Sequence, residues 1–391
     1  MRTKPAILAF FALATIATQG LLTSCAGDEN LGTEKQEGLQ TLKINLNTVT
    51  RAAAYTDPAS IIPNPENKVN RVTIGIFDKN LDTNGKYPVK TIQDAANAAA
   101  PEIITSQLVA GDHILVAVNA PAGTFTGVLT ESDFEKSTLG IDDALPVSTG
   151  TVAPTNLPMF GTDVIAGSST TFTSTVAVYH MVAKVTLKSL KVAFDATGAY
   201  KDATFTPTEV FMYSVPDTLD FYPASSPTSY VYNYLTTKTP TYYTGEAGKA
   251  SVKDYLGTGT LDASLSGKVL KGDASATTTN SWGTNLLYLY TMPNTSTTPT
   301  QLVIKGTFDS DGKGTTSDVY YPVSINYNSA NGTAAEGATP KQVYPNKNYI
   351  VDVTIKGKGA TSPSASLDPQ TVTATVNVQS FVDATQSNTF N

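Results

Sequence analysis

The chain is poor in the residues that catalysis and metal binding most often use. Its 391 residues include one cysteine and two histidines, and only 15% of them are charged. A single cysteine excludes an intrachain disulfide and a site built from several thiolates. His113 and His180 each lie in an apolar run with no second His or Cys at metal-ligand spacing. We therefore interpret both as core or edge residues of strands.

Basic residues are also scarce. The net charge is −7 and the isoelectric point is near 4.9. Proteins that bind nucleic acid need clustered Lys and Arg to displace counterions, and no such cluster is present. The composition therefore disfavours a nucleic-acid partner. The mean hydropathy of −0.10 and the 40% of hydrophobic residues indicate a soluble globular protein, long enough for two ordinary domains.

Arginine is the rarest of the common charged residues. The chain holds only Arg2, Arg51 and Arg71. Arg51 follows the strand-like run "TLKINLNTVT" and precedes "AAAYTDPASIIPNPENK", which is rich in Ala, Pro and Asn and has no periodicity. We therefore expect Arg51 to lie in an accessible joint, which is where proteolytic nicking concentrates.

The first 25 residues have the features of a targeting segment. Arg2 and Lys4 supply a positive start, "AILAFFALATIA" is apolar, and "LLTSC" follows. That ending resembles the lipobox of bacterial lipoproteins, so Cys25 is expected to become the lipidated first residue after signal peptidase II has cut. The alternative is an ordinary secretory peptide that contains a cysteine. Residues 26–40 are polar and predict a tether.

The rest of the sequence predicts an all-β protein with minor helical insertions. In the segment 41–50, the side chains of Leu42, Ile44 and Leu46 alternate with polar ones, which predicts a half-buried strand. Further strands are expected at 69–78, 101–108, 112–121, 173–194, 208–216, 285–294, 300–309, 319–328, 346–359 and 370–383, and short helices at 93–102 and 130–137. The run 112–121 is almost continuously apolar between Gly111 and Pro121, which predicts a strand buried on both faces.

The spacing of these strands predicts two domains. Most of them have no regular helix between them to make a parallel crossover, so we expect tandem antiparallel β-sandwiches. The segment 173–194 is long enough to pass from one domain to the other. We place the boundary near residue 185, with an N-terminal domain over 52–185 and a C-terminal domain over 186–391.

No motif predicts a catalytic residue or a cofactor. The turns at 80–91 and 309–320 lack the acidic residues of an EF-hand and are interpreted as hairpin turns. Nucleophile-elbow, phosphate-loop and dinucleotide motifs are absent. A pair of carboxylates, as in a glycosidase, stays open because spacing cannot locate it. The tyrosine-rich runs 230–235 and 241–245 are suited to sugar stacking or, more simply, to partial burial. Our prediction is therefore a protein that is not an enzyme.

These features together resemble the fimbrillins of the Bacteroidales, the FimA-type major fimbrial subunits. The resemblance rests on the lipobox, Arg51, "VNRVTIGIFD", "HILVAVNAP", "YHMVAKVTLKSLKV", "VYYPVSINYNSANG", "YPNKNYIVDVTIKGKGATSP" and "ATVNVQSFV", in the family's order. It covers almost the whole chain. The family often has Trp near the end, where this chain has Phe381 and Phe390.

The resemblance implies two transthyretin-like domains and a lipoprotein precursor of the outer membrane. It also implies that a gingipain-like, Arg-specific protease cuts between Arg51 and Ala52, releasing residues 26–51 with the strand 41–50. Loss of that strand would expose an apolar groove with unpaired backbone groups. In the tail at about 370–391, the alternation of Val372, Ala374, Val376 and Val378 with polar residues suits a donor strand that fills this groove in the next subunit.

The predicted function is therefore that of an extracellular fimbrial subunit supporting adhesion and biofilm formation. Its expected partners are other copies of itself head to tail, anchor and tip subunits, and surface ligands of a host or of bacteria. One alternative is a surface-anchored lipoprotein that binds glycans and does not polymerise, in which both terminal strands stay within their own chain. Another is a fimbrial anchor subunit, which would keep its lipid.

Overall fold

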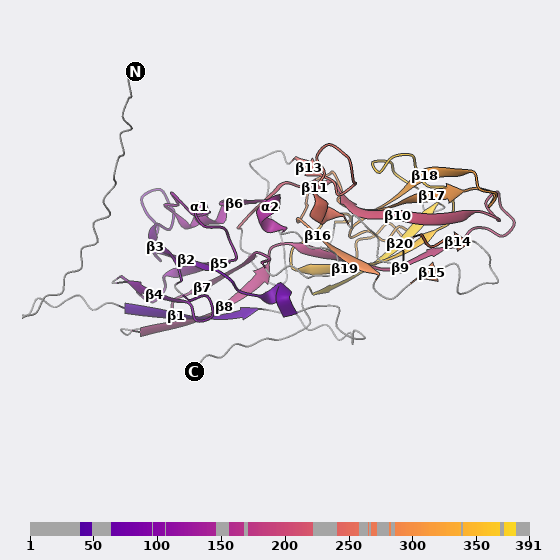
Figure 1. Ribbon diagram of the computed structural model, residues 1–391. Helices are drawn as coiled ribbons and strands as arrows, with labels where there is room; N and C mark the ends of the chain where they lie inside the picture. The colour runs from indigo at the N-terminus through magenta and orange to yellow at the C-terminus, as the bar shows by residue number, and fades with distance from the viewer. Residues whose placement is uncertain are drawn as a thin grey trace, which may run out of the picture. The chain divides into compact units, whose positions relative to one another are not determined.

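The computed structural model describes residues 40–48, 64–95, 97–105, 107–145, 156–167, 171–221, 241–257, 265, 267–271, 281–282, 286–337, 339–367 and 371–380. These residues belong to one compact unit. The fold is nearly all β, as the sequence predicts (Figure 1). Cys25, Arg51, Ala52, Phe381, Phe390 and the run 230–235 lie outside the described residues.

Eight strands lie among the described residues of the first half of the chain. They are β1 (Gln40–Thr48), β2 (Val72–Phe77), β3 (Val89–Asp94), β4 (Glu102–Thr105), β5 (His113–Val118), β6 (Thr138–Gly140), β7 (Met159–Val164) and β8 (Thr171–His180). The short helices described there are η1 (Asn64–Asn67), α1 (Glu131–Glu135) and α2 (Ile141–Ala144).

The part of the second half that the structure describes adds twelve strands. They are β9 (Ala183–Val192), β10 (Thr204–Tyr213), β11 (Val215–Pro216), β12 (Thr218–Asp220), β13 (Tyr242–Tyr243), β14 (Leu270–Lys271), β15 (Ser281–Trp282), β16 (Leu287–Thr291), β17 (Gln301–Asp309), β18 (Thr316–Ser324), β19 (Lys347–Ile355) and β20 (Val372–Ser380). One 3-10 turn, η2 (Asp254–Leu256), lies among them.

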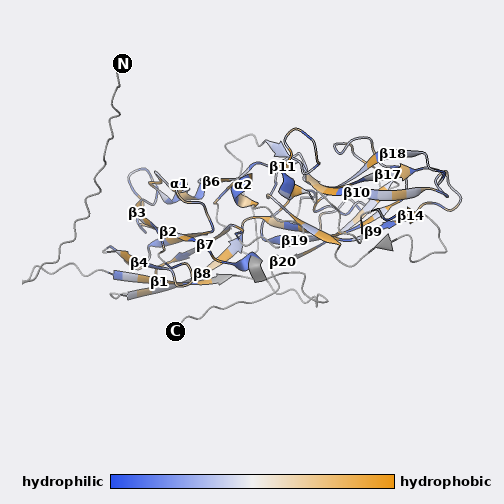
Figure 2. Ribbon diagram, viewed as in Figure 1, coloured by the Kyte–Doolittle hydropathy of each residue, from blue (hydrophilic) through white to orange (hydrophobic). Residues whose placement is uncertain are grey.

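A seven-stranded sheet in the order β3-β2-β5-β7-β8-β1-β4 organises the first half. Its pairings are antiparallel except that of β1 with β8, which is parallel. Residues from β4 and β2, near opposite ends of the strand order, share one apolar cluster, so the sheet curls around a core of its own. Figure 2 shows hydrophobic and hydrophilic residues alternating along strands such as β1.

The central strand β5 is buried on both faces, which confirms the prediction from its near-continuous apolar run. Ile114, Val116 and Val118 belong to the cluster inside the curled sheet. Leu115 and Ala117, with the opposite side-chain direction, join a second cluster that extends into the second half of the chain. The sheet therefore contacts two cores.

Two further sheets share that second core. One has the order β14-β10-β17-β18, and the other has the order β15-β9-β19-β20 with β16 also paired to β9. Their apolar faces contribute to the same cluster, including an edge-to-face pair between Phe205 on β10 and Tyr321 on β18. Here β9 and β19 are parallel, whereas the other pairings are antiparallel.

The segment 173–194 differs from its prediction as one long strand. β8 ends at His180 and β9 begins at Ala183, and the two strands lie in different sheets. The boundary near residue 185 remains a prediction.

The predicted helix at 130–137 is confirmed as α1, where Thr130 and Asp133 form a capping box. The helix predicted at 93–102 is wrong, because β3 ends at Asp94 and β4 begins at Glu102. Asn97 accepts hydrogen bonds from nearby backbone N–H groups instead, and this turn overrides the helix propensity of the alanines. No helix among the described residues has the length and apolar character needed to cross a membrane.

Candidate functional site

Strand β1 is an internal strand of the seven-stranded sheet. It pairs in parallel with β8 from Thr41↔Thr171 to Thr48↔Val178, and antiparallel with β4 from Gln40↔Thr105 to Lys43↔Glu102. Figure 1 shows β4, β1 and β8 side by side. The sequence predicts a strand at 41–50, but not that two other strands flank it.

The apolar side chains of β1 point into the curled sheet. Leu42 is fully buried and Ile44 is 3% exposed, while Leu46 is half-buried against the same cluster. Lys43 and Asn45 are exposed. The alternation seen in the sequence therefore corresponds to one core face and one wet face.

Strand β4 depends on β1. Among the described strands, β1 is its only ladder partner. The backbone N–H of Ile44 also donates to the carbonyl of Pro101 at 3.0 Å, just before β4 begins. Ile103 packs into the same cluster as Leu42. Removal of β1 would thus take away both the backbone partner of β4 and apolar neighbours of its buried residue.

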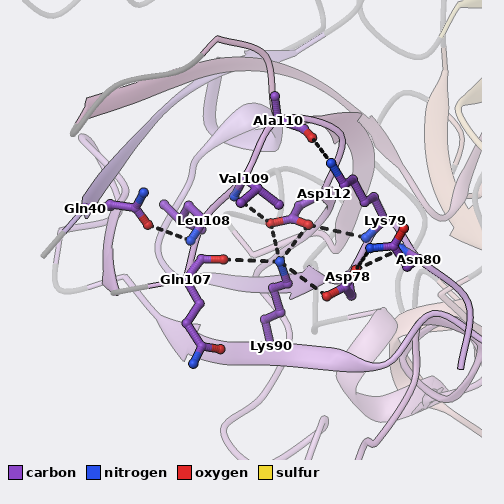
Figure 3. Close-up of polar contacts among 10 residues, drawn as sticks. All are labelled: Gln40, Asp78, Lys79, Asn80, Lys90, Gln107, Leu108, Val109, Ala110 and Asp112. Atoms are coloured by element: carbon purple, nitrogen blue, oxygen red, sulfur yellow. Dashed lines mark hydrogen bonds and ion pairs between the residues drawn. The ribbon is translucent and has the colours of Figure 1, made fainter. Parts of the chain in front are cut away.

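A polar contact fixes the start of β1. Gln40 accepts a hydrogen bond at its side-chain oxygen from the backbone N–H of Leu108, at 2.7 Å (Figure 3). Leu108 is 1% exposed, so few waters can replace this acceptor. The sequence carried no signal for the contact, because the two residues are far apart in the chain.

The residue next to Leu108 belongs to a buried ion-pair network. The Lys90 ammonium donates to the carbonyl of Gln107 at 3.2 Å and to the two carboxylate oxygens of Asp112 at 2.8 and 2.9 Å (Figure 3). Asp112 is fully buried and also accepts from the backbone N–H groups of Val109 and Lys79. These contacts hold the loop that receives Gln40.

The other terminal strand, β20, lies at an edge of its sheet. It pairs with β19 over nine residues, from Ile355↔Val372 to Lys347↔Ser380. Val372, Ala374 and Val376 are at most 6% exposed, and Val378 is half-buried. The four residues predicted to form one apolar face therefore share a face, and in this structure it covers the core of their own chain.

The outer edge of β20 is hydrogen-bonded to a loop after β18. The backbone N–H of Val376 donates to the Asn328 side chain at 2.7 Å, and that of Ala374 donates to the Ser329 hydroxyl at 2.8 Å. In return, the Ser329 N–H donates to the carbonyl of Ala374 at 3.2 Å. We call Asn328 and Ser329 the clasp, because they satisfy an edge that would otherwise be open to another strand.

A small pocket lies beside the start of β20. Its volume is about 100 Å³, and its lining includes Tyr327, Lys341, Leu367, Val372 and Ala374. Pockets that enclose small organic ligands are usually several times larger, at roughly 300–1,000 Å³. The pocket therefore offers little room for a sugar ring.

The short helix η1 begins at Asn64, and fifteen residues of the sequence separate it from the end of β1 at Thr48. Glu66 is fully buried and accepts from the Lys184 ammonium at 2.9 Å and from the Tyr290 hydroxyl. Burial, with the Glu66 charge nearby, raises the pKa of Tyr290 well above its usual value. This ion pair fixes the start of the fold after the segment that contains Arg51.

A histidine adjoins this ion pair. The ring Nε2 of His180 lies 2.9 Å from the Asn67 side-chain oxygen. Since that oxygen only accepts, Nε2 carries the proton. Burial, together with the charge of Lys184, lowers the pKa of His180 to about 3, so the ring is neutral.

Arg71 occupies a different environment from the one that the sequence predicts for Arg51. It immediately precedes β2 rather than lying inside it as expected. Its carbonyl accepts from the Asn119 N–H at 2.9 Å, and its guanidinium pairs with Asp94. The backbone around Arg71 is therefore engaged, which disfavours binding in a protease cleft.

The two turns considered as calcium sites are parts of β-hairpins. The turns at 80–91 and 309–320 lie in the hairpins β2–β3 and β17–β18, which confirms their interpretation. The Asp309 carboxylate accepts from backbone N–H groups, chiefly that of Gly314, and these bonds lower its pKa. Across the described residues, no group of three or more Asp, Glu, His or Cys side chains is placed to hold a metal ion.

Comparisons with known proteins place this fold. No protein-family model matches the chain. A candidate cell adhesion protein of Bacteroides eggerthii has a similar structure, with 22% identity and a TM-score of 0.56 over 90% of this chain and 98% of the other. Another, from Parabacteroides distasonis, has 12% identity and a TM-score of 0.57 over 88% and 98% of the two chains.

A fimbrilin of Porphyromonas gingivalis is also similar. Its crystal structure shares 16% identity and a TM-score of 0.54 over 89% of this chain and 99% of that chain. At these identities the likeness establishes the fold and not the function. The all-β architecture of this chain is thus that of fimbrilin and of candidate adhesion proteins.

Proposed function

We propose that this chain is a structural subunit of cell-surface fimbriae, matured by cleavage after Arg51 and polymerised by donor-strand exchange. Its role is to support adhesion and biofilm formation. The likeness to fimbrilin and to candidate adhesion proteins supports a surface role of this kind. The geometry of β1 supports the mode of assembly.

One observation carries the proposal: an internal strand of the sheet comes from the segment before Arg51. After a cut between Arg51 and Ala52, noncovalent contacts hold β1 in place: its ladder bonds, its buried side chains and the bond between Leu108 and Gln40. Its departure opens a groove between β8 and β4, lined by the apolar cluster and by unpaired backbone groups. Such a groove favours addition of another strand.

The C-terminal strand of a second copy is the proposed occupant. Val372, Ala374, Val376 and Val378 present the required apolar face. Because the donor strand and the groove are different surfaces, each subunit keeps one of each free for a further neighbour. Pairing of this kind is head to tail and builds a filament rather than a closed dimer.

The proposed route starts with a precursor that signal peptidase II processes and that is lipidated at Cys25 in the outer membrane. A gingipain-like, Arg-specific protease then cuts at Arg51 on the cell surface, and the subunit joins an extracellular fimbrium with anchor and tip subunits. Ligands on host or bacterial surfaces are the proposed targets of adhesion. The engaged backbone of Arg71 supports selective cutting at Arg51.

The test is the N-terminal sequence and intact mass of the protein sheared from the cell surface. We expect the wild type to begin at Ala52 and to run as an SDS-resistant ladder, and Arg51→Ala to yield neither. Arg71→Lys is the matched control and should mature normally. A wild-type surface protein that begins at lipidated Cys25 and stays monomeric would contradict the proposal.

A further inference from the structure

The contact between Gln40 and Leu108 sets a condition on any strand that replaces β1. When β1 leaves, the buried backbone N–H of Leu108 loses its acceptor. An incoming strand restores this bond only if it carries an acceptor side chain two residues before its first core-facing residue, as Gln40 precedes Leu42.

The C-terminal segment meets this condition in one register. Residues 40–48 read "QTLKINLNT" and residues 370–378 read "QTVTATVNV". With an offset of 330, Gln, Thr and Asn recur at the first, second and eighth places. The three core-facing residues of β1, Leu42, Ile44 and Leu46, align with Val372, Ala374 and Val376.

Apolar residues alone would not select this register. The alternation continues to Val378, so a slip by two residues still places three aliphatic side chains in the groove. These side chains are also smaller than those of β1, so they fill the groove less completely and distinguish less strongly between one register and the next. Gln370 is the residue that distinguishes the two registers.

We propose that residues 370–378 of a second copy enter the groove with Gln370 in the place of Gln40, its side-chain oxygen accepting from Leu108. The inference rests on the proposed strand exchange and specifies its register. Since β1 runs parallel to β8 and antiparallel to β4, the incoming strand does the same. Thr373 of the second copy then lies opposite Thr173 on β8 and opposite Glu102 on β4, as Lys43 does in the precursor.

Engineered cysteines read this register directly. Residues 52–391 contain no cysteine, so any disulfide between mature subunits must form between the engineered cysteines. We would place Thr373→Cys with Thr173→Cys in the full-length chain, oxidise the surface polymers and look for covalent oligomers. The control pairs Thr373→Cys with Thr171→Cys, also exposed on β8, which Thr373 would face after the slip by two residues that brings Val378 into the groove.

The two failures are separable. Covalent oligomers in the first pair and not in the second support the register. Polymers that cross-link only in the shifted pair overturn it while leaving strand exchange intact. Absence of polymers from the wild type as well as from the cysteine variants would overturn the proposed function.

A second experiment tests the role of Gln370. Gln370→Ala should make polymers dissociate in denaturant on the order of tenfold faster, because a buried N–H loses its acceptor. Gln370→Glu retains an acceptor oxygen and should restore most of the resistance. Gln93→Ala, an exposed glutamine on β3, is the matched control. Equal dissociation of Gln370→Ala and the wild type would contradict the proposal.

Discussion

At the scale of single residues, burial decides which charged groups contribute most to the stability of the fold. Glu66 and Lys184 are 0% and 2% exposed at their side chains and lie 2.9 Å apart. The second Glu66 oxygen has no hydrogen-bond partner among the described residues. Such a pair is held by mutual compensation, and either member alone would be an uncompensated buried charge.

We therefore expect Lys184→Met to destabilise the protein by about 3–5 kcal/mol. Adding Glu66→Leu should recover part of this loss, because the double variant leaves no unpaired charge. The measurement is the free energy of unfolding in denaturant for the single and double variants. Additive losses would contradict this account of the pair.

Glu135 on α1 predicts a pH dependence. Burial, with the nearby charge of Glu131, raises its pKa from 4.5 to about 7. Between these values the folded state binds the proton more tightly than the unfolded state does. This group's contribution to stability is therefore lost as the pH rises from about 4.5 to about 7.

Accordingly, Glu135→Gln should stabilise the protein by about 1–3 kcal/mol at pH 8 and leave it nearly unchanged at pH 4. Thermal unfolding of both proteins across this range measures the difference. An equal effect at both pH values would show that the substitution acts through packing rather than through titration.

At the scale of elements, the two terminal strands are held differently. β1 is flanked by strands on both sides, whereas β20 has a strand on one side and the clasp on the other. The clasp contributes a few hydrogen bonds, and each of these has a modest net value of about 0.5–1.5 kcal/mol. An edge held in this way opens more readily than an internal strand.

The core face of β1 supports a direct prediction. Leu42→Ala should destabilise the uncut protein by about 2–5 kcal/mol, since Leu42 is fully buried in the curled sheet. Lys43→Ala, on the exposed face of the same strand, should change stability by less than about 0.5 kcal/mol. Denaturant unfolding of the uncut protein measures both, and similar losses would contradict the assigned faces.

At the scale of the whole molecule, the effect of cutting should be local. β1 contributes to the cluster inside the seven-stranded sheet and not to the cluster shared by the sheets of β10 and β9. Loss of β1 therefore exposes one core and leaves the other covered. The parts of a protein with the fewest remaining buried contacts open first.

Hydrogen exchange before and after an Arg-specific cut tests this expectation. In cut subunits kept too dilute to polymerise, the amides of β4 should lose protection, because β4 loses its ladder partner β1. The amides of β17 and β19 should keep theirs. A uniform loss across all sheets would show that the two cores unfold as one.

Three features could be predicted without any structure: the all-β class, a strand at residues 41–50 with one apolar and one polar face, and the position of Arg51 in a segment without periodicity. Alternation and turn composition are local properties, so these predictions needed no contacts. The sequence also predicted β5 as buried on both faces. The helix predicted from the alanine-rich segment 93–102 was wrong, because the weak helix propensity of these residues is overridden by a turn that Asn97 fixes.

The contacts of β1 could be known only from the folded chain. Its parallel pairing with β8, the dependence of β4 on it, the bond from Leu108 to Gln40, and the clasp on β20 each join residues far apart in the chain. Strand pairing is set by the closure of a shared core, and no local pattern encodes which strands meet. The alternation in β1 therefore marked a strand, while the fold made it an internal strand of a sheet.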